Sequence, residues 1–250
     1  MKFVLVALLV GACLTVSWPS ATKTITKSAP IEVKDGQTFD GFKENGNKWV
    51  RYDRGRKNLG NCKNVEGGKK DAVFLLYKGA TLKNVILGAN AVEHVHCESE
   101  GCTVENVYWE DVCEDALTFE NGKSSGAKFY VKGGGARNGS DKIIQHNSAG
   151  TVYISNFYCE NSGKLYRACG NCKSGYQGKR TVVMNNVTVK NVGTVAGYNR
   201  NFGDTVTLNN ISVTGGHVCR AFQGRNDGKE PTAIGYQCDQ QGTISSCTCK

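Results

Sequence analysis

Residues 80–86 read ATLKNVI and residues 102–108 read CTVENVY, so one pattern of apolar and β-branched residues around an asparagine returns after a fixed interval. Asn84 precedes Asn106 by 22 residues. Further copies occur at residues 150–157 (GTVYISNF), 181–189 (TVVMNNVTV) and 205–213 (TVTLNNISV). A repeat of this length, with strand-forming residues and no helical spacing, predicts a solenoid of β-strands.

Each repeat is expected to form a short strand, a bend at the asparagine and a second short strand. Alternate apolar side chains then point inward, while the asparagine hydrogen-bonds the backbone at the corner. Stacked coils form parallel sheets in which equivalent residues of neighbouring coils lie about 4.8 Å apart. We therefore predict an all-β solenoid of about eight coils. A two-sheet sandwich is the alternative, but it predicts turns every 8 to 12 residues or so without a longer repeat.

The N-terminal residues have the layout of a secretory signal peptide, with Lys2, an apolar run over residues 3–16 and then small and turn residues. The run is shorter than the roughly 20 residues that a membrane span needs. We expect residues 1–21 to be a signal peptide and residues 22–250 to form a single domain, because the composition does not change again. The sequence thus predicts a secreted, extracellular protein.

The cysteine count also fits export. The chain has 12 cysteines, and disulfides persist in an oxidising compartment. Cys13 would leave with the signal peptide, so an odd number remains and at least one thiol is free or bonded to another chain. Cys169 and Cys172 have the spacing of zinc and redox sites, but export favours a structural disulfide.

The formal net charge of +9 suits an anionic partner, such as nucleic acid, a membrane surface or an acidic polysaccharide. Export makes nucleic acid the weakest of the three. No later apolar stretch approaches the length of a membrane span. We expect a monomer whose partner is neither nucleic acid nor a membrane.

Four acidic residues form a candidate metal site. A coil of about 22 residues places Glu93 beside Asp115, with Glu114 adjacent and Asp111 a few residues earlier. Carboxylates this close repel one another unless a cation neutralises them. Hard oxygen ligands select calcium or magnesium, and calcium tolerates the less regular geometry. We predict a Ca²⁺ site, with partly solvated loop acids as the alternative.

Three basic residues follow the same spacing. Lys142 precedes Lys164 by 22 residues, and Arg167 lies three residues further along. Like charges stacked one coil apart are unfavourable without an anion between them, so an anionic ligand is implied. Together with the carboxylates, this pattern indicates a calcium-dependent site for an acidic polysaccharide, whereas a solvated basic surface is the alternative.

Three motifs carry a family resemblance: WEDVCEDA (109–116), DKIIQHN (141–147) and GKLYRACGNC (163–172). They resemble the motif blocks of pectate lyases of polysaccharide lyase family three, and the similarity extends from about residue 29 to the C-terminus. DAVFLL (71–76) and NVILG (84–88) also fit. The resemblance implies a right-handed parallel β-helix and a secreted calcium-dependent enzyme that cleaves de-esterified pectin, a plant cell-wall polymer, by β-elimination.

The resemblance also implies roles for individual residues. It assigns Ca²⁺ binding to Glu93, Glu114 and Asp115, with Asp111 as a further candidate. It assigns substrate binding and catalysis to Lys142, Lys164 and Arg167. The segment around Glu93 reads EHVHC where the family has Asp-Gly-Ile-His-Cys, so a longer acid stands here. Arg167 is implied as the base that removes the C5 proton of a galacturonate unit. Lys164 is the alternative base, because lysine pKa values fall readily beside other cations.

Two other functions remain open. A glycoside hydrolase on the same solenoid would need paired carboxylic acids flanking the bond and no essential calcium. A non-catalytic secreted protein that binds polygalacturonate would keep the cations but tolerate loss of the carboxylates. The cations opposite the acids favour the lyase.

Overall fold

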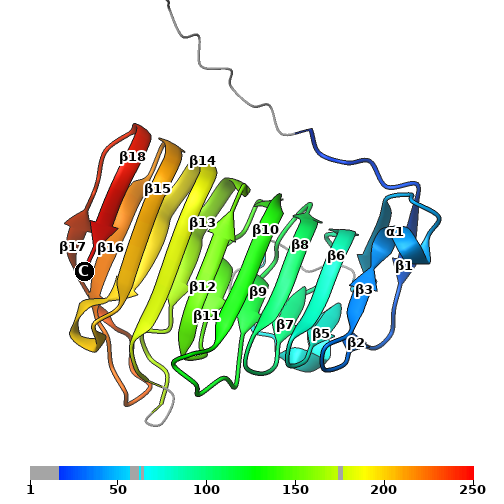
Figure 1. Cartoon of the computed structure of the whole chain (residues 1–250), viewed down its shortest axis with the longest axis horizontal. Helices are drawn as coiled ribbons and strands as arrows, with labels where there is room; N and C mark the ends of the chain where they lie inside the picture. Colours follow the sequence, from blue (N-terminus) through cyan, green and yellow to red (C-terminus); the bar gives the residue numbers. More distant parts are fainter. Residues whose placement is uncertain (1–16, 57–61, 63–64, 174–176) are drawn as a thin grey trace, which may run out of the picture.

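The computed structural model describes residues 17–56, 62, 65–173 and 177–250. The chain winds as a stack of coils along one axis, from the N-terminal strands to the C-terminal strands (Figure 1). Most of the predicted signal peptide lies outside the described residues. Trp18, near its end, packs edge-on against Tyr108 at 5.7 Å and against Tyr158 at 6.4 Å between ring centroids.

Strands dominate the described residues, with one short α-helix and two 3₁₀ turns. The elements follow in this order: β1 Lys23–Thr26, β2 Ile31–Val33, β3 Thr38–Asp40, α1 Gly41–Glu44, β4 Val50–Asp53, η1 Lys69–Asp71, β5 Phe74–Leu76, β6 Ala80–Leu87, β7 Val95–Cys97, β8 Cys102–Trp109, β9 Asp115–Phe119, β10 Lys128–Arg137, β11 Lys142–His146, β12 Gly150–Ser155, β13 Tyr158–Ala168, β14 Arg180–Asn199, η2 Arg200–Phe202, β15 Thr205–Thr214, β16 His217–Gln223, β17 Thr232–Gln237 and β18 Gly242–Cys249.

The pairing of these strands is parallel along the body of the stack. One face, here called the site sheet, runs β2–β5–β7–β9–β11–β13–β14–β16. The faces around it are built from β3, β4, β6, β8, β10, β12 and β15, and the long strands β10, β13 and β14 pass from one face to the next. The chain is a single-domain parallel β-helix of about eight turns, which confirms the predicted fold.

The asparagines of the repeat bend the chain by adopting positive φ, for example 56° at Asn84 and 54° at Asn106. Asparagine tolerates this left-handed region better than most residues. Their side chains hydrogen-bond one another between coils, since Asn106 Nδ2 donates to Asn84 Oδ1 at 2.8 Å. Asn210 Nδ2 donates to Asn186 Oδ1 at the same distance. The prediction that each asparagine bonds backbone at the corner is therefore wrong, because the coil spacing brings asparagine onto asparagine.

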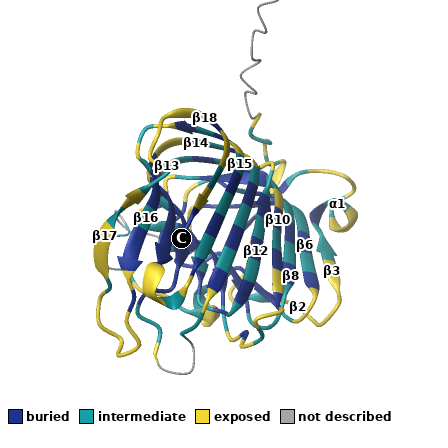
Figure 2. Ribbon diagram, turned by 60° about the vertical axis from the view of Figure 1, so that its left-hand side comes forward, coloured by how far each residue is buried: buried dark blue, intermediate teal, exposed yellow. Residues whose placement is uncertain are grey.

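The core consists of stacked equivalents from successive coils. One stack is fully or almost fully buried: Leu82, Val104, Val131, Ile154, Met184 and Leu208. Figure 2 shows the alternation along β10, β12 and β15, where buried bands alternate with less buried ones. Burial of each such side chain contributes about 1.5 to 3 kcal/mol.

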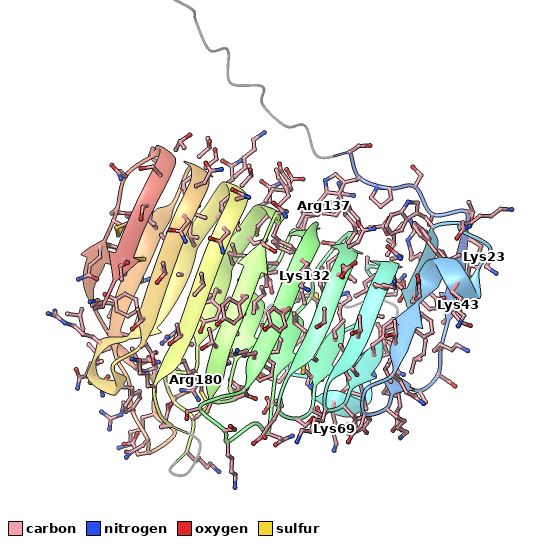
Figure 3. All side chains as sticks on the ribbon, in the orientation of Figure 1. Lys23, Lys43, Lys69, Lys132, Arg137 and Arg180 are labelled. Carbon is pink, nitrogen blue, oxygen red and sulfur yellow. A yellow bond between two sulfur atoms is a disulfide. The ribbon has the colours of Figure 1, made fainter. Side chains whose placement is uncertain are left out.

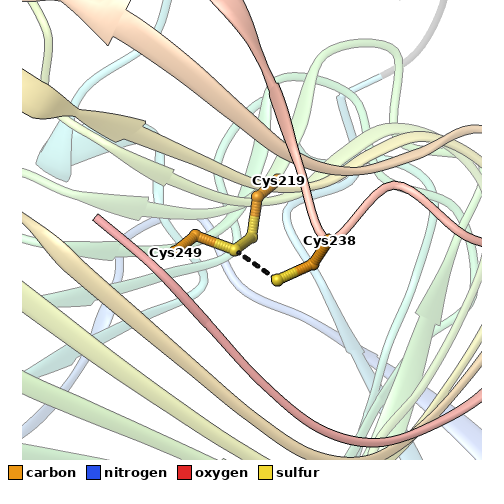
Figure 4. Close-up of side chains that lie close together, drawn as sticks. All are labelled: Cys219, Cys238 and Cys249. Atoms are coloured by element: carbon orange, nitrogen blue, oxygen red, sulfur yellow. Dashed lines mark hydrogen bonds between the residues drawn. A yellow bond between two sulfur atoms is a disulfide. The ribbon is translucent and has the colours of Figure 1, made fainter.

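The last strands depart from the predicted parallel order. β17 is antiparallel to β16, and β18 is antiparallel to β15. A stack of coils ends in an unpaired apolar edge, and antiparallel return strands cover it. Two disulfides hold these last strands in place. Cys219 of β16 is bonded to Cys249 of β18, and Cys238, just after β17, is bonded to Cys247 of β18. Figure 4 shows Cys238 beside the first pair, its Sγ 3.2 Å from Cys249 Sγ.

The remaining cysteines agree with the sequence prediction. Cys62 pairs with Cys113, Cys97 with Cys102, and Cys169 with Cys172, so the CxxC segment is a structural disulfide. Cys159 is a free, buried thiol, which accounts for the odd count. Within the described ranges, no helix combines the length and the apolar character that crossing a membrane requires.

Candidate functional site

The strand register places the predicted site residues in one column of the site sheet. Asp115 is paired with Lys142, and Lys142 with Lys164. Val95 of β7 is paired with Leu117 of β9. Glu93 and Asp115 each come two residues before these paired residues, so they lie beside each other. The 22-residue spacing read from the sequence is thus a spacing of one coil in the structure.

The acidic end of this column is buried. Glu93 is 4% exposed and Asp115 is 5% exposed. Glu93 Oε2 and Asp115 Oδ1 have no hydrogen-bond donor, although His96 Nε2 lies 3.3 Å from the first and Lys142 Nζ 3.6 Å from the second. Buried carboxylate oxygens without donors are costly unless a cation is present. This donor set, hard oxygens with unfilled bonding capacity, fits a calcium ion.

The pKa values of this cluster point the same way. Burial, followed by the charge of Glu93, raises the pKa of Glu114 to about 8. Burial also raises the pKa of Asp115 to about 7, and the charge of Lys142 offsets only part of this rise. Burial and the neighbouring acids therefore disfavour the ionised form of Glu114 and Asp115, and a bound cation would favour it.

Two further residues define the edges of the cluster. Gly67 N donates to Glu114 Oε2 at 2.5 Å, and a side chain at Gly67 would meet Glu93 Cγ at 2.7 Å, so only glycine fits there. Asp111, in contrast, is exposed and is not among the residues that line the grooves around the other three acids. The structure brings Glu93, Glu114 and Asp115 together and leaves Asp111 outside.

The two lysines share an anion that the sequence analysis did not assign. Asp141 Oδ2 accepts from Lys142 Nζ and Asp141 Oδ1 from Lys164 Nζ, each at 2.5 Å. Burial opposes ionisation of Asp141, but the two lysines lower its pKa overall. Burial would likewise lower the pKa of Lys142, but the charges of Asp115 and Asp141 raise it. The inference that the stacked lysines need a bound anion was incomplete, because the chain supplies one.

Arg167 is the most buried of the predicted cations, at 6% exposed on β13. Its Nη1 donates to Ala168 O at 2.6 Å and to Asn199 Oδ1 at 3.2 Å, whereas Nη2 is buried without a partner. The guanidinium lies 4.0 Å from the centroid of the Phe222 ring. Burial lowers the pKa of Arg167 to about 10. An arginine with one unused nitrogen and a lowered pKa is suited to taking up a proton.

The residues that position Arg167 were missed by the sequence analysis. Asn199 Nδ2 donates to Asp204 Oδ2 at 2.9 Å and to Cys169 O at 2.9 Å, so Asn199 presents its oxygen to Arg167 in a fixed direction. Asp204 also accepts from Arg180 N at 2.8 Å. The sequence did contain one signal for these residues. Polar residues stand at the end of the long β-branched run that forms β14, where a purely structural strand would be apolar.

Gly197 leaves the space that Arg167 occupies. Gly197 is paired with Arg167 in the register, and a Cβ there would lie 2.7 Å from Arg167 Cδ. We expect Gly197→Ala to displace the guanidinium and lower kcat by about 10²-fold, since misplacement by about 1 Å has that effect. Circular dichroism should show an intact fold. Unchanged kcat with an unchanged fold would mean that Arg167 has room to move without consequence.

The column opens into a groove of about 510 Å³. Its lining includes Asp115, Lys142, Lys164 and Arg167, and it continues to Arg220 and Phe222 on β16. Other basic residues lie elsewhere along the stack, among them Lys23, Lys132 and Arg137 in Figure 3. The positive charge is therefore distributed over the molecule, while the groove combines both signs.

Comparison with known proteins gives a consistent picture. The family model described as pectate lyase matches residues 15–229. A protein from Aspergillus terreus named "Probable pectate lyase F" is 47% identical over 219 residues, covering 87% of this chain and 88% of its own length. "Pectate lyase E" of Emericella nidulans is 46% identical over 214 residues, covering 85% and 78% respectively.

Solved structures show the same similarity. The catalytic domain of pectate lyase PelI from Erwinia chrysanthemi superimposes with a TM-score of 0.63 at 31% identity, covering 84% of this chain and 94% of that one. The structure of PelI in complex with tetragalacturonic acid superimposes with a TM-score of 0.62 at 30% identity, covering 88% and 66%.

Proposed function

The chain belongs to the pectate lyases of polysaccharide lyase family three, and from this premise we propose that it is a secreted, calcium-dependent enzyme that cleaves de-esterified pectin by β-elimination. The observation that carries the proposal is a groove in which the buried carboxylate of Asp115, whose Oδ1 has no hydrogen-bond donor, adjoins Lys142, Lys164 and Arg167. Such a groove can hold a polyanion and a divalent cation together. The tetragalacturonic acid bound to a relative supports the same substrate class.

Glu93, Glu114 and Asp115 would hold the calcium ion. When bound, calcium supplies positive charge for a galacturonate carboxylate and makes the neighbouring C5 proton more acidic. Lys142 keeps its proton, because nearby acids raise its pKa, and it can pair with the same substrate carboxylate. Asp141 keeps Lys142 and Lys164 oriented toward the groove.

Arg167 is the proposed base. Its unpartnered, buried Nη2 takes the C5 proton once the guanidinium is neutral. The electron pair of the broken C5–H bond forms the C4=C5 double bond, the C4–O bond breaks, and the departing oxygen takes a proton from solvent. The product is an unsaturated sugar at the new non-reducing end. Lys164 remains the alternative base.

Secretion is supported by the chain's covalent structure. Five disulfides join ten cysteines of the described residues, a number that an oxidising compartment maintains. The sequence of the first residues has the layout of a signal peptide.

The decisive test of the proposed function is the identity of the product. Purified protein incubated with polygalacturonate and Ca²⁺ is expected to generate an unsaturated product that absorbs in the ultraviolet. A glycoside hydrolase would release reducing ends without that absorbance, and a binding protein would release neither. Either of these outcomes would overturn the proposal.

A further inference from the structure

The groove contains a fourth cation, Arg220, that lies beyond the predicted site. Arg167 is paired with Gly197 of β14, and Gly197 is paired with Arg220 of β16. Arg220 therefore continues the same column of the site sheet, two strands beyond Arg167 or roughly 10 Å at the usual strand spacing. Because Gly197 has no side chain, nothing of that residue stands between the two arginines.

Arg220 differs from the other cations in its partners. Lys142 and Lys164 are bonded to Asp141, and Arg167 to a carbonyl and to Asn199. In the portion of the chain that the structure describes, the side chain of Arg220 has no hydrogen bond and no ion pair. Its guanidinium lies 5.3 Å from the centroid of the Phe222 ring and 5.8 Å from that of the Tyr236 ring.

The local backbone presents Arg220 in this way. The register between β16 and β17 shifts at Ala221 and Phe222, and such a bulge redirects the side chains next to it. Tyr236 is paired with Arg220 across the antiparallel strands, and His217 stacks on Tyr236 with ring centroids 3.9 Å apart. The rings of Phe222 and Tyr236 thus lie beside the guanidinium, and Arg220 lines the groove with its side-chain donors unused.

We propose that Arg220, supported by Phe222 and Tyr236, binds a carboxylate of the polyanionic substrate two strands beyond the reacting sugar and makes the protein prefer long chains. This inference rests on the proposed function. The guanidinium is a planar donor that suits bidentate carboxylate binding, and its position in line with Arg167 matches a polymer lying along the groove. A short oligomer that spans only the strands from Asp115 to Arg167 would not reach it.

The test compares Arg220→Gln with the wild type on polygalacturonate and on a galacturonate trimer. A charged contact of this kind is worth roughly tenfold in affinity. We expect KM for polygalacturonate to rise about tenfold and kcat to stay within about twofold, with no change on the trimer. Arg200→Gln removes an equal charge from the exposed turn η2 and should change neither. An unchanged ratio of kcat/KM between the long and short substrates would overturn the inference.

Direct binding separates this inference from the proposed function. Calorimetry with a galacturonate hexamer is expected to give a Kd about tenfold higher for Arg220→Gln, whether or not the substrate is cleaved. If the wild type binds the hexamer but forms no unsaturated product, the proposed function fails while Arg220 can still be assessed. Arg220→Lys, which keeps the charge and most of the packing, should restore part of the affinity; equal Kd values for all three proteins would contradict the proposal.

Discussion

Replacing Arg167 with lysine is expected to lower kcat on polygalacturonate by about 10³-fold, within the range that a general base contributes. The charge is kept, so binding of the substrate should change little. The planar fork that bonds Ala168 O and Asn199 Oδ1 is lost, and the reactive nitrogen moves away from the position of Nη2. Steady-state kinetics together with calorimetry on an oligogalacturonate would separate the two effects.

The pH dependence of the rate follows from the same residue. Burial lowers the pKa of Arg167 to about 10, and only the neutral guanidine can accept a proton. The fraction of neutral Arg167 therefore grows as pH rises toward that value, so kcat should increase on the alkaline side and level off near pH 10. A rate that falls steadily above pH 8 in a stable protein would contradict a base with this pKa.

Two lysine variants serve as controls for Arg167. Lys142→Ala removes one contact to the substrate carboxylate and should weaken binding and rate together. Lys164→Ala distinguishes the two candidate bases. If Arg167→Lys keeps near-normal turnover while Lys164→Ala has none, Lys164 is the base and the assignment of Arg167 is wrong.

The parts of the site that could be predicted from sequence are those set by the coil period. Glu93, Asp115, Lys142 and Lys164 were placed correctly in one column because a repeat of fixed length converts spacing into contact. The sequence pattern does not distinguish Asp111 from the other acids. In the structure the bend after β8 leaves Asp111 exposed, and only the conformation of that bend determines its position.

The supporting residues could not be predicted in the same way. Asn199, on β14, and Phe222, on β16, both contact Arg167. They come 32 and 55 residues after it in the chain. Their distance from Arg167 is not a multiple of the 22-residue period, because the loops between these coils differ in length. The antiparallel strands β17 and β18 lie outside the repeat altogether, so the pattern contains no information on their direction. Arg220 and Tyr236 depend on that cap.

Removal of calcium is expected to abolish cleavage and to destabilise the fold. Without a cation, Glu93, Glu114 and Asp115 would oppose the approach of a substrate carboxylate, since their charges are only partly compensated by His96 and Lys142. A ligand at a hundred times its Kd stabilises the folded state by about 2.7 kcal/mol. For a domain of this size that corresponds to a rise in Tm of roughly 5 to 10 °C, measurable by calorimetry with Ca²⁺ and with a chelator.

Variants of the acidic residues identify which of them bind the calcium ion. Asp115→Asn should lose both the calcium-dependent rise in Tm and the activity, because its buried Oδ1 is one of the oxygens without a donor. Asp111→Asn should keep both, because Asp111 is exposed outside the grooves that the other acids line. If Asp111→Asn also lost the rise in Tm, the ligand set read from the sequence would be right and the one drawn from the structure too small. Cleavage that continues undiminished in excess chelator would instead remove calcium from the mechanism, leaving the lysines and Arg167 to bind the substrate carboxylate alone.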